Sequence, residues 1–65
     1  MAATQLELME AKRQLDSILH KLNETVKTLE MKENVERYKS QISLANNRIK
    51  AMEVAIALIE REINS

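Results

Sequence analysis

Residues 35–63 read VERYKSQISLANNRIKAMEVAIALIEREI. In alternating steps of three and four residues, successive positions carry side chains suited to the seam between two packed helices. These positions are Val35, Tyr38, Ile42, Ala45, Ile49, Met52, Ile56, Ile59 and Ile63. This is the spacing of the a and d positions of a heptad repeat. It predicts one helix over about residues 35–63 that packs along its seam against a neighbour.

The same stretch carries more apolar surface than one seam needs. Residues 51–59, AMEVAIALI, are apolar at eight of nine positions. At about 100° per residue, five apolar side chains outside the seam gather roughly 120° away from it, with Val54 farther round. They are Leu44, Ala51, Val54, Ala55 and Leu58. One neighbouring helix cannot cover both faces, so we predict that these five residues bind another protein.

An earlier stretch, about residues 4–31, predicts the neighbouring helix. Thr4 and Glu7 have the spacing of a capping box, which predicts where this helix begins. Leucines recur every seven residues from Leu8 to Leu29, and Ala11, Ile18, Leu19 and Val26 widen that line into a stripe. Together the two stripes predict a hairpin core of Leu8, Leu15, Leu19, Leu22, Val26, Leu29, Tyr38, Ile42, Ile49, Met52, Ile56, Ile59 and Ile63.

The break between the helices is predicted at residues 31–34, MKEN. Asn34 is a good N-cap for a second helix that starts at Val35, and it could instead be the left-handed residue that ends the first helix. With no Gly or Pro in the chain, one unbroken helix of roughly 60 residues and ~90 Å is the alternative. We expect the all-α antiparallel hairpin, as a single domain over residues 1–65.

The composition limits what the chain can do. A chain of 65 residues is near the lower limit for folding on one core, and there is no Cys for a disulfide or a thiolate metal site. A two-helix hairpin has one packing interface, so we expect the chain alone to be marginally stable or to self-associate into a four-helix arrangement. The first residues lack the pattern of a secretory signal, and no apolar run approaches ~20 residues. We therefore expect a cytoplasmic protein with no membrane partner.

Few residues suggest chemistry. Asp16, His20 and Glu24 share one helical edge at i,i+4 spacing, which could be a weak metal site or an acid–base cluster. A solvated edge with mild helix-stabilising pairs is the more favoured interpretation. We expect no catalytic, metal-binding or cofactor-binding residue, and no enzyme activity.

Nucleic acid is a further alternative partner. Arg37, Lys39, Arg48 and Lys50 make the middle of the chain modestly basic. However, ten acidic and ten basic residues cancel, and Tyr38 is the only aromatic residue for stacking on a base. We therefore expect no nucleic-acid partner.

Residues 51–59 resemble the closing segment of the small YscE/PscE/AscE-type co-chaperones of the type III secretion needle subunit. In that family the second helix of a hairpin carries the run Ala/Gly-Leu-Glu-x-Ala-Ile/Leu-x-Ile-Ile/Val. The matching residues are Ala51, Glu53, Ala55, Ile56 and Ile59, with Met52 in place of Leu. The chain length, the opening at residues 4–7 and a Tyr early in the second helix also agree. Tyr38 lies about one helical turn farther from Ala51 than in the family, and the predicted loop lacks the family's Gly.

The resemblance implies a binding role without chemistry. In that family the hairpin docks on a tetratricopeptide-like chaperone and stabilises it. The pair then keeps the needle subunit monomeric in the bacterial cytoplasm, chiefly through that subunit's C-terminal helix. Here the five predicted partner-binding residues would complete the core of the chaperone without necessarily touching the needle subunit. The alternative is a self-sufficient homodimeric helical bundle that acts as an adaptor or RNA-binding regulator.

Overall fold

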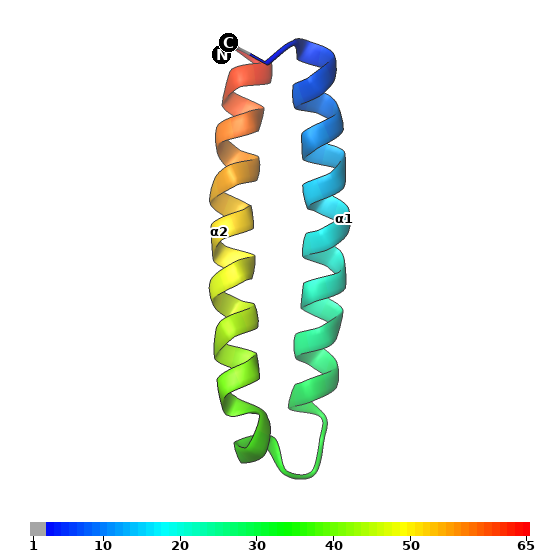
Figure 1. Cartoon of the computed structure of the whole chain (residues 1–65), viewed down its shortest axis with the longest axis vertical. Helices are drawn as coiled ribbons and strands as arrows, with labels where there is room; N and C mark the ends of the chain where they lie inside the picture. Colours follow the sequence, from blue (N-terminus) through cyan, green and yellow to red (C-terminus); the bar gives the residue numbers. More distant parts are fainter. Residues whose placement is uncertain (1–2) are drawn as a thin grey trace.

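The computed structural model describes residues 3–65 and shows two long antiparallel helices joined by a short loop (Figure 1). Helix α1 spans Gln5–Glu30 and helix α2 spans Lys39–Ile63, with a 3-10 turn, η1, at Val35–Tyr38. The molecule measures 46 × 17 × 15 Å. The predicted hairpin is therefore confirmed, and the alternative of one unbroken helix of ~90 Å is wrong.

A capping box starts α1, as the spacing of Thr4 and Glu7 predicts. The Thr4 hydroxyl Oγ1 accepts a hydrogen bond from the Glu7 backbone N–H at 3.1 Å. In return, Glu7 Oε1 accepts a hydrogen bond from the Thr4 backbone N–H at 2.9 Å. This bond, followed by a hydrogen bond from the Thr4 hydroxyl to the same carboxylate, lowers the pKa of Glu7. Two backbone donors that α1 leaves unpaired are thus satisfied by side chains.

Asn34, in the loop, has neither of the two roles predicted for it. Its side chain makes no capping hydrogen bond, so the predicted N-cap is wrong. Its φ is −105°, and no described residue has a positive φ, so the left-handed role is also wrong. Instead, the Asn34 carbonyl accepts a hydrogen bond from the Arg37 backbone N–H at 3.0 Å and opens η1. The chain reverses over residues 31–34, and the tighter i→i+3 geometry of η1 then leads into α2 without a Gly or a side-chain cap.

The core is a single strip between the two helices. Val26, Ala45 and Ile56 are its most buried members, at 7–9% exposed. Val26 and Ile56 belong to the thirteen predicted core residues, and the other eleven are half-buried. In the described part of the chain each long helix packs along its length against the other alone, so water reaches both flanks of the strip. Val35, the first predicted seam position, lies in η1 and is 41% exposed, so the seam in the structure begins at Tyr38.

Loss of the capping hydroxyl should measurably destabilise the hairpin. Thr4→Ala removes the acceptor for the Glu7 backbone N–H and should lower the free energy of unfolding by about 1 kcal/mol. The matched control is Thr28→Ala, because the Thr28 hydroxyl only donates to the Glu24 carbonyl in the helix interior. This control should be neutral or slightly stabilising, since Ala is the better helix former. Urea unfolding followed by circular dichroism measures both, and equal losses would rule out a special role for the cap.

Candidate interaction surface

The five predicted partner-binding residues lie on α2 where α1 covers them little. Leu44, Val54 and Leu58 are 51–56% exposed. Ala51 is also exposed, whereas Ala55 is half-buried at the edge of the helix–helix contact. We call these five residues the outer face. The structure thus gathers them on one helix, in contact with water.

The ion pair between the helices lies on one side of the hairpin, and the position of the outer face can be stated relative to it. Lys12 of α1 and Glu60 of α2 approach to 3.7 Å and bridge the helices on one side. At about 100° per residue, Ala51 lies about 180° around α2 from Glu60. The outer face is therefore turned away from the side of the ion pair.

Helix α1 adds Ile18 to the apolar side. Around α1, Lys12 and Ile18 flank the core position Leu15 on opposite edges. Around α2, Glu60 and Ala55 flank Ile56 in the same way. Because Lys12 and Glu60 meet on one side of the interface, Ile18 and Ala55 emerge on the other side. Ile18 is 41% exposed, so it extends the apolar surface of the outer face across to α1.

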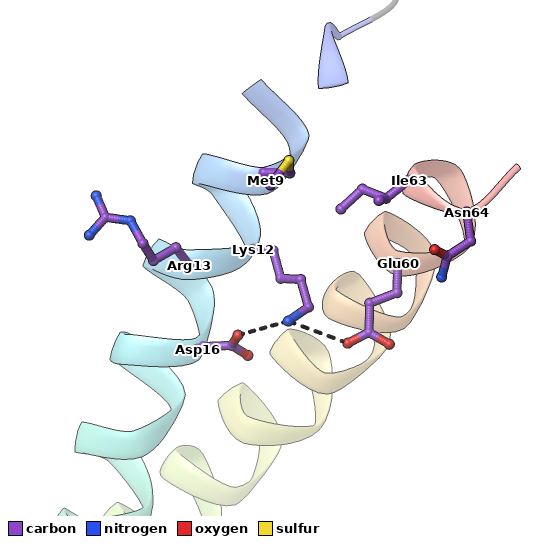
Figure 2. Close-up of a pocket in the computed structure, with 7 residues that line it drawn as sticks. All are labelled: Met9, Lys12, Arg13, Asp16, Glu60, Ile63 and Asn64. Carbon is purple, nitrogen blue, oxygen red and sulfur yellow. Dashed lines mark hydrogen bonds and ion pairs between the residues drawn. The ribbon is translucent and has the colours of Figure 1, made fainter. Parts of the chain in front are cut away.

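The other side of the hairpin is charged. Lys12 Nζ lies 3.2 Å from Asp16 Oδ2 as well as 3.7 Å from Glu60 Oε1, and Figure 2 shows it between the two carboxylates. The hydrogen bond and charge of Asp16, followed by Glu60, raise the pKa of Lys12. Arg13 points away from α2 and pairs with Glu10 at 2.7 Å.

A shallow hollow of about 480 Å³ lies at this charged end of the hairpin. It is lined by Met9, Lys12, Arg13, Asp16, Glu60, Ile63 and Asn64 (Figure 2). Lys12 pairs with Asp16 within α1 and with Glu60 across to α2, so these three charged groups already hold one another. The hollow is therefore an open part of the charged, ion-paired side of the hairpin.

The structure divides the cluster of Asp16, His20 and Glu24 between separate ion pairs. Asp16 pairs with Lys12, and Glu24 pairs with Lys27 at 3.6 Å. Within residues 3–65, no three His, Cys, Asp or Glu side chains come together as a group that could hold a metal ion. These residues therefore form a solvated edge with i,i+3 and i,i+4 pairs.

The basic residues of the middle stretch do not form one patch. Arg48 and Lys50 are about 160° apart around α2 at 100° per residue, so they face opposite sides of the hairpin. At the loop, the Lys32 ammonium lies 5.6 Å from the centre of the Tyr38 ring, in a cation–π contact. The only aromatic residue is therefore already occupied by a cation from the same chain.

Sequence reasoning missed the ion pair between the helices. The i,i+4 spacing of Lys12 and Asp16 is visible in the sequence and could have indicated the first half of it. The approach of Glu60 depends on the register of the two helices, which no local pattern specifies. The same register brings Gln5 Nε2 to donate a hydrogen bond to the Ile63 carbonyl at 3.2 Å.

Comparison with known proteins identifies no relative. No protein-family model, curated protein or solved structure matches the chain significantly. In the described part of the chain, neither helix combines the length and the apolar character that crossing a membrane requires.

Stability should depend on pH at both ends of the scale. The pKa values of Glu7 and Glu10 are lowered by their hydrogen bonds, so their contributions are present above pH ~4.5 and are lost as the pH falls below it. The pKa of Lys12 is raised, so its contribution is present below pH ~10.5 and is lost as the pH rises above it. Melting temperatures should be flat between about pH 6 and 9.

Two substitutions test the alkaline part of this profile. Lys12→Gln should reduce the fall in melting temperature above pH ~10, because the titrating partner of Asp16 and Glu60 is gone. Lys50→Gln is the matched control, since no ion pair of Lys50 occurs among residues 3–65. An alkaline profile that both variants change equally would contradict the role of Lys12.

Proposed function

We propose that this chain is a co-chaperone of type III secretion. It binds and stabilises a tetratricopeptide-like chaperone, and the complex keeps the needle subunit monomeric in the bacterial cytoplasm before export. The observation that carries the proposal is the outer face of α2. It presents three large apolar side chains that are about half exposed, on a hairpin whose own interface lies elsewhere.

The outer face has the shape that another helix requires. Leu44, Ala51 and Leu58 are seven residues apart and lie on one line along α2. The small side chains of Ala51 and Ala55 allow a second helix to approach closely between the two leucines. A helical-repeat chaperone consists of stacked helices with apolar faces, so it offers a helix of this kind. Burying the exposed apolar area of these residues favours association by about 25 cal/mol per Å².

The position of the ion pairs of the hollow, away from the outer face, also supports binding at this face. The charged groups of the hollow pair with one another on the opposite side of the hairpin. The similarity of residues 51–59 to the co-chaperone segment falls on the same helix turns as the outer face. In such a complex the chain supplies apolar surface to the chaperone, and the chaperone in turn covers the needle subunit.

A matched pair of substitutions tests the proposal. Ala51 lies on the outer face, Ala57 lies about 120° around α2 from it toward the side of the ion pair, and both are exposed in the hairpin. Ala51→Glu places a charge in the proposed contact and should abolish the complex, because a buried unpaired carboxylate is strongly unfavourable. Ala57→Glu introduces the same charge and should leave binding unchanged. Leu58→Glu should behave like Ala51→Glu.

The measurement is co-expression with the tetratricopeptide chaperone and the needle subunit of a type III secretion system from the organism that encodes the chain. The wild type and Ala57→Glu should co-purify with both proteins and keep the needle subunit monomeric in size-exclusion chromatography with light scattering. Ala51→Glu should lose the chaperone while its helicity by circular dichroism is retained. A wild type that binds neither protein would refute the proposal. Loss of helicity together with binding in Leu58→Glu would show that the face is intramolecular core.

A further inference from the structure

The charges of this neutral chain are sorted along its length. Residues 21–50 form the half of the hairpin next to the loop, and they contain seven basic and four acidic side chains. The half that holds both termini, residues 3–20 and 51–65, contains three basic and six acidic side chains. Because each half includes part of both helices, the separation runs along the 46 Å axis (Figure 1). The loop half therefore has a net charge of +3 and the terminal half −3.

We propose that, in the absence of its chaperone, a second copy of this chain covers the outer face. The two copies are related end over end by a two-fold axis that crosses α2 near Ala51. In this arrangement the positive loop half of each copy lies over the negative terminal half of the other. A parallel arrangement would instead place like charges over each other along the whole length, which is unfavourable. The charge distribution therefore favours a second copy of the chain as the partner, and it favours the end-over-end orientation of that copy.

The apolar residues of the outer face fit the same axis. Leu44 and Leu58 are each seven residues from Ala51, on opposite sides of it. A two-fold axis at Ala51 thus places Leu44 of each copy against Leu58 of the other, and Ala51 against itself. The two contacts between Leu44 and Leu58 lie on either side of Ala51, whose small side chain lets the two α2 helices approach closely. Their burial contributes more than any exposed ion pair, so it sets the register, while the charges set the direction.

The length of the hairpin agrees with this axis. The hairpin is 46 Å long and 17 Å wide. With the axis at Ala51, near the middle of the long dimension, the two copies overlap over nearly their full length.

The chaperone and the second copy would occupy the same residues, so binding of the chaperone must dissociate the dimer. Only that competition rests on the proposed function. The dimer itself is tested on the purified chain alone, so a failure of either idea can be told from a failure of the other.

Disulfide cross-linking tests the axis directly, because the chain contains no Cys. Ala51→Cys should form a cross-linked dimer on mild oxidation, since the axis brings the two introduced thiols within bonding distance. Ala57→Cys, about 120° around α2 from Ala51 and so away from the axis, should remain uncross-linked. Leu44→Cys and Leu58→Cys should cross-link when mixed, and neither should cross-link alone. Cross-linking of Leu44→Cys with itself would show a parallel arrangement and overturn the proposal.

Sedimentation equilibrium of the uncross-linked chain provides the second measurement. The wild type should be a dimer whose dissociation constant rises with salt, because opposite charges attract across the interface. Ala51→Glu should raise the dissociation constant at least ~10-fold, whereas Ala57→Glu should leave it within about twofold of the wild type. A wild type that stays monomeric at millimolar concentration, or a dimer that salt strengthens, would overturn the proposal.

Discussion

One constraint governs this structure: two helices share only one interface. Each seam residue has a neighbouring helix on one side and water on both flanks. As a result only Val26, Ala45 and Ile56 are buried among residues 3–65, and the remaining seam residues are half-buried. A chain whose α2 carries a second apolar line cannot hide that line within itself. The outer face is a direct consequence of this limit.

The polar contacts between the helices determine register more than stability. The side chains of Lys12 and Glu60 are 35% and 50% exposed, and partly exposed ion pairs of this kind contribute little free energy. However, the pair forms only when the two helices are aligned in one way, and Gln5 on the Ile63 carbonyl requires the same alignment. These contacts lie on the charged side or at the open end of the hairpin. Neither contact involves a residue of the outer face.

Much of the fold could be predicted from the sequence because its signals are local and periodic. The heptad spacing of the seam, the leucine stripe of α1 and the capping box of Thr4 and Glu7 each involve residues within one or two helical turns. The loop could not be predicted in the same detail. Without Gly or Pro, the sequence did not distinguish an Asn34 cap from a 3-10 turn, because that choice depends on how the hairpin closes. The Lys12–Glu60 pair was missed for a similar reason, since it depends on the register of residues 48 positions apart.

The distribution of charge has a consequence for how such a face can be regulated. An exposed apolar face on a small hairpin is a liability in water, so a free chain benefits from a cover. A second copy that is bound through a few leucines and through long-range charge attraction forms a stable dimer. It can still exchange with another partner, because no buried ion pair or hydrogen-bond network has to break. In the proposed function, the chaperone would compete with the second copy for Leu44, Ala51 and Leu58. The apparent affinity of the chaperone for the chain then falls as the total concentration of the chain rises, because a larger fraction of the chain is dimeric. Self-association would thus reduce the amount of chain available to bind unrelated apolar surfaces, while a chaperone with a better-fitting helix would still displace the second copy.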